Sequence, residues 1–406
     1  MIKASTGQWT IEEGMTGKYG IQCLPPGTPV FNQGNVILIE DLKNKLTQVS
    51  DRYGASQNIV SYLERDIDED AVQIKIRNLP WFTITKEHPI LIARFDDDIN
   101  RLRDNMKWWS YSYLSYKMNI DFVKAENVRR GDYVLIPLHT PKKPLERIKV
   151  WSGHKKKYDS HKHGPTEITI DKDFCYFLGW YLAEGYVSKS CKHPILSVNT
   201  YHDIDFMKKR IVPYFEKLSI KASIYRGQSP KTAVVQVLDK YFGQFIWNLI
   251  PRHAKEKYIP SFVFDLPEEP LLEFLRGYGL GDGFVVKRNE TPIGISFTTS
   301  SLYIAYQLFY LLLSRFKSAV TLHHIDFSQY KSTLSKNSQG YVITVYSDIA
   351  SKILPDVFKQ KKGSNPVLII DNYALLRVDS IRTVHYKGKV YNIAVSYTHL
   401  TLPTKA

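Results

Sequence analysis

Two acidic residues stand in matching positions of two similar helix-like segments. Glu184 ends the apolar stretch DFCYFLGWYLAEG and Asp282 ends PLLEFLRGYGLGDG, and a glycine follows each acid. A helix C-terminus disfavours a carboxylate by about 0.3–1 kcal/mol, so one such case would be an ordinary helix end before a glycine, whereas two indicate a function. Two carboxylates that meet repel each other unless they are protonated or bridged by cations. Oxygen ligands favour Mg²⁺, so Glu184 and Asp282 are candidate metal ligands.

The helices that carry these acids must pack closely for the carboxylates to meet. Each has a glycine on one face, Gly179 and Gly277, and small residues on facing sides let two helices approach. After each helix the pattern gives strands, a further helix and further strands. The central region is therefore predicted to be an internal duplication rather than an array of short repeats.

This doubled motif resembles the two LAGLIDADG motifs of a monomeric homing endonuclease, over roughly residues 166–370. The resemblance implies two pseudo-symmetric α/β halves whose curved β surface lies in the major groove of double-stranded DNA. It also implies that Glu184 and Asp282 bind the Mg²⁺ ions that activate water and stabilise the leaving oxygen. HAKEKYIPSFVF at 253–264 resembles the segment between the motifs, where the family has a lysine near the active site. Lys257 is therefore a candidate catalytic residue, and a surface lysine is the alternative.

A lone cysteine opens the stretch CLPPGTPVF, in front of a Pro-Pro-Gly turn and without a partner cysteine nearby. This stretch resembles the first block of an intein splicing domain, which implies that the Cys23 thiol attacks the carbonyl of Gln22 to form a thioester. TKEHPI resembles the second block. It implies that Thr85 helps to hold the scissile bond and that His88 protonates the departing amide nitrogen. A core histidine in a strand is the alternative for His88.

The order of segments predicts a β domain that is interrupted by an α/β domain. Residues 23–138 are rich in alternating and β-branched patterns, and LLRVDSIRTVHYKGKVYNIAV near the end is similar. The predicted fold class is mixed, an all-β Hint splicing domain interrupted by an α/β LAGLIDADG endonuclease domain with two-fold pseudo-symmetry. The expected parts are an N-extein fragment at 1–22, the N-terminal part of the splicing domain at 23–140, a basic linker at 141–165, the endonuclease at 166–370, the C-terminal part of the splicing domain at 371–395 and a tail at 396–406.

The end of the chain departs from the intein pattern. KVYNIAV fits the closing strand, with Asn392 where the family usually has Asp. After Val395 no His-Asn pair and no downstream nucleophile follow, and Thr398 and His399 do not stand in the required order. VSYTHLTLPTK resembles the translated adapter of a sequencing library. We therefore expect an artefactual tail on a truncated splicing domain that can form a thioester at Cys23 but cannot complete splicing.

The length and net charge of the chain indicate how many domains it has and which class of partner it binds. The chain has 406 residues, enough for two or more domains, and a net charge of +15, which favours a polyanion such as nucleic acid. Segment 141–163 has eight Lys/Arg against two acids and is predicted to be a solvated linker that could also lie on phosphates. We expect a monomer that acts on double-stranded DNA and, in cis, on host extein segments.

The number of cysteines and the distribution of apolar residues indicate the cellular compartment. Cys23, Cys175 and Cys191 are too few and too scattered for a disulfide framework, and the latter two are expected to be structural. The N-terminus lacks the shape of a signal peptide, and the longest apolar run is too short to span a bilayer. The sequence therefore predicts a cytoplasmic protein without a membrane partner.

Two other functions fit parts of the sequence. A degenerate element could bind DNA through the doubled motif without cutting it. A hedgehog-type autoprocessing domain would explain Cys23, Thr85 and His88, but not the doubled motif.

Overall fold

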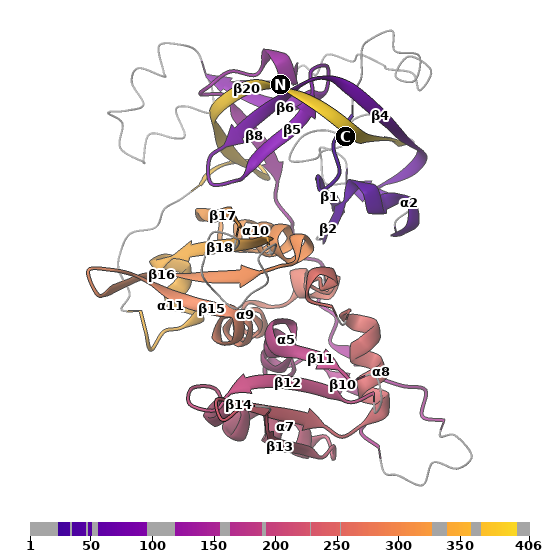
Figure 1. Ribbon diagram of the computed structural model, residues 1–406, viewed down its shortest axis with the longest axis vertical. Helices are drawn as coiled ribbons and strands as arrows, with labels where there is room; N and C mark the ends of the chain where they lie inside the picture. Colours follow the sequence, from indigo (N-terminus) through magenta and orange to yellow (C-terminus); the bar gives the residue numbers. More distant parts are fainter. Residues whose placement is uncertain are drawn as a thin grey trace. The chain divides into compact units, whose positions relative to one another are not determined.

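The computed structural model describes most of the chain, and its residues divide into two compact units (Figure 1). Unit 1 contains residues up to 139, residues 310–319 and residues from 366 onward, and unit 2 contains residues 140–309 and 320–365. The described residues are 23–32, 35–45, 48–50, 56–95, 118–154, 163–188, 192–227, 229–251, 253–326, 339–358 and 367–395.

Unit 1 is built almost entirely of β-strands, as predicted for residues 23–138. Its main sheet has the order β3-β4-β20-β8-β6-β7, with β5 paired to β4 and β19 paired to β20, and β1 and β2 form a separate hairpin. The strands are β1 (Pro29–Asn32), β2 (Asn35–Leu38), β3 (Gln48–Ser50), β4 (Ser56–Ile76), β5 (Trp81–Thr85), β6 (Pro89–Phe95), β7 (Met118–Lys124), β8 (Tyr133–Pro137), β19 (Leu368–Ile370) and β20 (Tyr373–Val395). Three short helices accompany them, η1 (Ile39–Asp41), α2 (Leu42–Lys45) and η4 (Ala125–Asn127).

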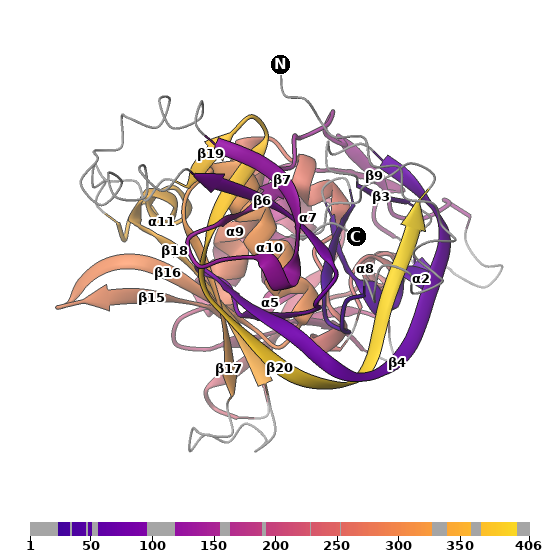
Figure 2. The same cartoon turned by 90° about the horizontal axis from the view of Figure 1, so that it is seen from above.

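Two long antiparallel strands, β4 and β20, dominate unit 1 and curve together along their length (Figure 2). Side chains alternate between the two faces of a strand. On one face an exposed ladder of opposite charges links the strands, with Lys389 Nζ 2.5 Å from Glu64 and Lys387 Nζ 2.6 Å from Asp68. On the other face Ile67 and Val390 pack with Cys23 in a buried cluster.

Unit 2 contains two halves with the same order of elements. The first comprises α5 (Lys172–Glu184), β11 (Gly185–Val187), β12 (Pro194–Asn199), a helical segment of α6 (Ile204–Phe206), η5 (Met207–Ile211) and α7 (Val212–Lys217), then β13 (Ala222–Arg226), β14 (Thr232–Val237) and α8 (Lys240–Leu249). The second comprises α9 (Glu268–Asp282), β15 (Gly283–Arg288), β16 (Thr291–Thr299), α10 (Leu302–Phe316), β17 (Val320–Asp326), β18 (Gln339–Tyr346) and α11 (Ser347–Ile353). The short helices η6 (Ala254–Glu256) and η7 (Ser261–Asp265) connect them.

The two sheets of unit 2 have equivalent strand orders, β11-β12-β14-β13 and β15-β16-β18-β17. In both, the third strand in sequence lies at the edge and the fourth lies inside, and all pairs are antiparallel. The α/β duplication predicted from the sequence is therefore present. A difference between the halves is η5, a π-helical turn, whereas the corresponding α10 is α-helical from Leu302 to Phe316.

The structure corrects two expectations about segment boundaries. The basic segment is not solvated throughout, because β9 (Arg147–Lys149) pairs with β10 (Glu167–Thr169) and Trp151 stacks on Tyr241 with ring centroids 4.5 Å apart. Residues 310–319, expected to belong to the endonuclease, group with unit 1. Tyr310 stacks on Phe31 at 4.3 Å, and the Ser314 hydroxyl accepts a hydrogen bond from the His139 amide.

Several predictions concern residues that lie outside the described part of the chain. These are the N-extein fragment at 1–22 with Gln22, residues 396–406 with Thr398 and His399, and Cys191.

Candidate functional site

The two motif helices, α5 and α9, meet backbone to backbone at glycines. A Cβ atom on Gly179 would lie 2.1 Å from the carbonyl oxygen of Phe274, and one on Gly277 would lie 2.2 Å from that of Tyr176. Nearer the C-termini, a Cβ on Gly281 would lie 2.5 Å from the Ala183 side chain. The contacts advance in the same direction along both helices, so the helices are parallel and their C-terminal ends are neighbours.

The candidate metal ligands are the last residues of these helices, as the sequence predicts. Burial, and next the charge of Asp282, raise the pKa of Glu184 to about 7. Burial also raises the pKa of Asp282 to about 6, although the charge of Lys257 opposes this. The Asp282 carbonyl accepts a hydrogen bond of 2.8 Å from the Thr298 hydroxyl. Two carboxylates thus share a poorly hydrated site, next to two helix C-termini whose dipoles add negative potential.

Lys257 is not a surface residue, which removes the alternative that the sequence left open. Only 5% of the residue is exposed. Its ammonium donates to the carbonyl oxygens of Leu182 at 2.8 Å, Tyr181 at 3.2 Å and Ala183 at 3.3 Å. These are last-turn carbonyls of α5, and that of Tyr181 also accepts from the Gly185 amide, so Lys257 adds a side-chain cap to this helix end. Burial lowers its pKa to about 8, although Asp282 and Glu184 oppose this.

Sequence reasoning missed two residues that hold Lys257 in place. The Ser301 hydroxyl donates to the Lys257 carbonyl at 2.6 Å. The Gln307 side-chain oxygen accepts from the Ile259 amide at 2.7 Å, and its amide group donates back to the Ile259 carbonyl at 3.4 Å. A signal was available, because Gln307 is a buried polar residue inside an otherwise apolar helix.

The residues at the helix ends fit a divalent cation with oxygen ligands. Within the described ranges no group of three or more His, Cys, Asp or Glu residues could hold a metal. Glu184 and Asp282 would therefore supply two carboxylates, and the other ligands would be carbonyl, water or phosphate oxygens. Mg²⁺ commonly binds in this way, through one or two carboxylates with waters and substrate phosphates. A cation there would also offset the burial that raises the pKa values of both carboxyl groups and the repulsion by Asp282 that adds to the rise at Glu184.

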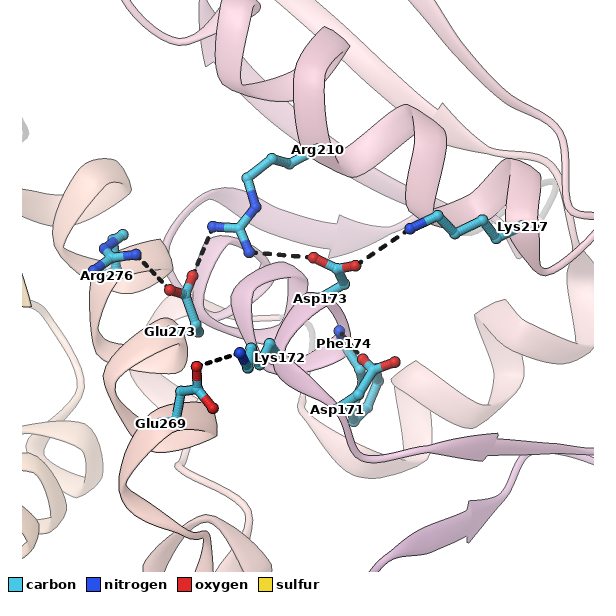
Figure 3. A network of polar contacts seen from close by, with 9 residues as sticks. All are labelled: Asp171, Lys172, Asp173, Phe174, Arg210, Lys217, Glu269, Glu273 and Arg276. Carbon is cyan, nitrogen blue, oxygen red and sulfur yellow. Dashed lines mark hydrogen bonds and ion pairs between the residues drawn. The ribbon is translucent and has the colours of Figure 1, made fainter.

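An ion-pair network joins the two halves at the other end of the helices (Figure 3). Arg210, from η5, donates to Glu273 of α9 at 2.6 Å and to Asp173 of α5 at 3.2 Å. Its guanidinium also lies over the Tyr176 ring, 3.8 Å from the centroid. Glu273 further pairs with Arg276, and Lys172 pairs with Glu269. The acids at the N-termini of α5 and α9 complement the positive ends of both dipoles.

In unit 1 the structure brings Cys23 and Thr85 into direct contact. The Cys23 amide donates to the Thr85 hydroxyl at 2.9 Å, and that hydroxyl donates to the Cys23 carbonyl at 3.0 Å. The next residue, Leu24, forms a β-bridge with Tyr391 of β20 through hydrogen bonds of 2.9 and 2.8 Å. Cys23 is thereby fixed between β5 and β20, with only 1% of its surface exposed.

His88 follows Thr85 in the turn between β5 and β6. Its amide donates to the Thr85 carbonyl at 3.1 Å, its carbonyl accepts from the Ala125 amide at 2.8 Å, and the residue is buried. Thr85 and His88 therefore belong to one short turn beside the Cys23 backbone. Asn392 lies in β20, and its side-chain oxygen accepts from the Ile393 amide at 2.9 Å. Cys175 is buried inside α5, as expected of a structural residue.

Comparison with protein families assigns part of unit 2. Residues 269–380 match the family model of the LAGLIDADG-like domain. The match begins in α9, includes the second half of the α/β duplication and ends at residue 380, within β20. No helix in the described ranges is both long and apolar enough to cross a membrane.

Several proteins contain a segment similar to this chain. The ATP-dependent DNA helicase Hel308 of Thermococcus kodakarensis is 23% identical over 401 residues, which cover 92% of this chain and 35% of the helicase. A DNA polymerase of the same organism is 26% identical over 62% of this chain and 16% of the polymerase. An uncharacterized protein of Methanocaldococcus jannaschii, MJ1054, is 26% identical over 69% of this chain and 32% of that protein. The chain thus spans about a third or less of the length of these relatives.

Solved structures show a weaker likeness. The structure of I-DmoI in complex with DNA and Mn covers 47% of this chain with 11% identity and a TM-score of 0.31. The N-terminal LAGLIDADG domain of DUF199/WhiA covers 48% of this chain with 13% identity and a TM-score of 0.31.

Proposed function

We propose that unit 2 is a homing endonuclease that cuts double-stranded DNA with the help of a divalent cation. The observation that carries this proposal is the pair of half-buried carboxylates, Glu184 and Asp282, at the adjoining ends of two glycine-packed helices. The family match to the second half adds to it. A two-fold arrangement with one carboxylate per half suits a substrate that also has two strands related by a two-fold axis.

Each residue of the site has a distinct part in the proposed reaction. A bound Mg²⁺ would supply activated water and stabilise the leaving phosphate oxygen. Glu184 and Asp282 would hold the cation and position the scissile phosphates against it. Lys257 places positive charge beside both carboxylates and keeps the end of α5 fixed, so Glu184 retains its position when charge changes in the site. The net charge of +15 favours approach of the DNA backbone.

A selection from DNA with a randomised target region tests the nuclease. With Mg²⁺ we expect a discrete set of cleaved sequences, and Glu184→Gln and Asp282→Asn should abolish cutting while DNA binding persists. Cutting by either variant at the wild-type rate would refute the metal assignment. DNA binding by the wild type without cutting would favour a degenerate, DNA-binding element.

We infer a second function for unit 1, an intein-type acyl shift at Cys23. The observation that carries it is the contact of Thr85 with the amide nitrogen of Cys23, which is the leaving group of the Gln22–Cys23 bond. The relatives support it independently, because similar segments occur inside a helicase, DNA polymerases and an RNA polymerase subunit. A segment shared by proteins with such different activities behaves as an insertion rather than as the catalytic part of each host.

Thiol-induced cleavage tests this second function. Purified protein treated with dithiothreitol or hydroxylamine should be cleaved after Gln22, as read by mass spectrometry. Cys23→Ala should prevent cleavage, Thr85→Val should slow it by about tenfold or more, and Thr85→Ser should retain most of it because the hydroxyl is preserved. Absence of cleavage in the folded wild-type protein would refute the acyl shift in this chain.

A further inference from the structure

The strand register around Cys23 places one basic side chain on the same face as the thiol. Cys23 packs against Ile67 of β4 and Val390 of β20, and Tyr386 lies against this cluster. Residues 65, 67 and 69 share a face because side chains alternate along β4. The register confirms it, since Arg65 lies opposite Val390 and Glu69 lies opposite Tyr386. Arg65 and Glu69 therefore lie on the inner face of β4, on either side of Ile67, which packs against Cys23.

Arg65 is unusually placed for an arginine in a strand. Its neighbours Glu64 and Asp66 point outward into the exposed charge ladder, whereas Arg65 is half-buried on the inner face. Its Nε atom is buried and has no hydrogen-bond partner among the residues that the structure describes. A buried guanidinium is costly unless a negatively charged group neighbours it. A thiolate at Cys23 would be such a group.

The electrostatics of the thiol agree with this geometry. Burial raises the pKa of Cys23, whereas the charge of Arg65 and a hydrogen bond from its side chain oppose that rise, and Glu69 adds to it. The other polar groups of this site are the Thr85 hydroxyl, the His88 imidazole and the Tyr386 hydroxyl, which donates to the Lys389 carbonyl. Arg65 is therefore the cation among the groups that surround the sulfur.

We propose that Arg65 stabilises the thiolate form of the Cys23 sulfur and is a catalytic residue of the acyl shift, which rests on the function proposed for unit 1. The thiolate sulfur bonds to the carbonyl carbon of Gln22, the bond from that carbon to the Cys23 nitrogen breaks, and the nitrogen takes up a proton. The proton that leaves the thiol balances the one that the amine gains. Arg65 acts before the sulfur–carbon bond forms. Burial of the site lowers the fraction of Cys23 that is a thiolate, and the positive charge of Arg65 increases that fraction.

The test measures the reaction of Cys23 with methyl methanethiosulfonate as a function of pH, with the label located by mass spectrometry. For Arg65→Gln we expect labelling at pH 7 to slow by about tenfold, and the rate to reach the wild-type plateau only at higher pH. Arg65→Lys should restore most of the rate, since the positive charge remains. Arg77→Gln is the matched control, because Arg77 lies just beyond β4 and pairs with Asp379 on the surface.

A purely structural role gives the opposite result. If Arg65 only supports the fold, Arg65→Gln loosens the site and labelling of the buried thiol accelerates at all pH values, which would overturn the proposal. Thiol-induced cleavage after Gln22, measured on the same samples, separates the two proposals. If the pH profile of labelling is shifted in Arg65→Gln but the wild type is not cleaved, the contact of Arg65 with the thiolate is supported and the acyl shift is refuted. Cleavage with an unchanged labelling profile would refute the role of Arg65.

Discussion

Lys257 and Arg65 are basic residues that lie beside buried groups which must carry negative charge to react. A low-dielectric site suppresses ionisation, so an enzyme that buries a carboxylate or a thiol needs a compensating cation nearby. Lys257 has this position next to Glu184 and Asp282, and it also caps α5. The sequence indicated Lys257 only through a family resemblance, whereas Arg65 gave no signal, because its neighbours in sequence point to the opposite face of β4.

Substitution of Lys257 should affect cutting more than it affects DNA binding. Lys257→Met removes the ammonium donor from the last carbonyls of α5, so we expect the protein to lose about 1–3 kcal/mol of stability and most of its cutting activity. Lys255→Met, at an exposed position two residues earlier, is the control and should change neither. Thermal unfolding, DNA affinity and cutting rate are the measurements. If the Lys257→Met protein is stable and cuts DNA at the normal rate, Lys257 has no part in catalysis and only caps the helix.

The parallel packing of α5 against α9 is electrostatically unfavourable. Parallel helices repel each other because their dipoles point the same way. Acids at the N-terminal ends and Lys257 at the C-terminal end of α5 reduce this repulsion, and the proposed cation between the carboxylates would reduce it further. Close glycine contacts then supply the dispersion energy that holds the helices together. The sequence predicted the glycines and the acids, but it could not predict the Arg210 bridge, which depends on the π-helical turn of η5.

Adding a methyl group at the helix crossing tests the backbone contact. Gly277→Ala places a Cβ 2.2 Å from the Tyr176 carbonyl oxygen, so the helices must separate, and we expect a loss of about 1–3 kcal/mol together with loss of cutting. Gly279→Ala lies in the same helix but, among the described residues, meets only the Phe297 ring, at 3.1 Å, and no backbone atom. The control should be close to neutral, because alanine favours helix by up to about 1 kcal/mol over glycine. Equal effects of both changes in chemical denaturation would argue against a special contact at Gly277.

The Arg210 bridge should couple the two halves energetically. Arg210→Gln removes contacts to both Glu273 and Asp173, and we expect a loss of about 1–3 kcal/mol. Lys217 reaches the same Asp173 from 3.7 Å but its side chain is 71% exposed, so Lys217→Gln should cost less than about 0.5 kcal/mol. In a double-mutant cycle Arg210→Gln and Glu273→Gln should be non-additive. Additive losses would mean that Arg210 acts without Glu273.

At the scale of the whole chain, the sequence predicted local patterns better than long-range ones. The duplication was visible because an apolar helix, a glycine and a terminal acid recur together, and unit 1 was recognisable by its period-two strands. The pairing of β9 with β10 was missed because β9 is a three-residue strand in a basic segment. The grouping of residues 310–319 with unit 1 was missed because it depends on Phe31, which is remote in sequence from Tyr310. The splicing-domain boundaries and the nature of residues 396–406 stay predictions.

The carboxylate pair predicts how the stability of the metal-free protein depends on pH. In an unfolded chain Asp and Glu ionise near pH 4, whereas here the pKa values are about 6 for Asp282 and about 7 for Glu184. Between about pH 4 and pH 7 the folded state binds more protons than the unfolded state, so the contribution of these groups to stability falls as pH rises. Lys257 has the opposite slope at higher pH: because its pKa is lowered to about 8, the unfolded state binds more protons between about pH 8 and pH 10, so stability rises with pH there, and Lys257 adds little slope below pH 7.

The contribution of the pair is isolated by difference, because the chain also contains twelve histidines, a residue type that in model peptides ionises at about pH 6.5. The free energy of unfolding of the wild type minus that of the Glu184→Gln/Asp282→Asn variant should decrease from pH 5 to pH 8 without metal. Mg²⁺ should raise the difference again at pH 8, because binding to the folded state alone adds RT ln(1 + [Mg²⁺]/Kd). Chemical denaturation at each pH, with EDTA or with Mg²⁺, measures it. A difference that is flat with pH and insensitive to Mg²⁺ would show that the two carboxylates neither repel each other nor share a cation.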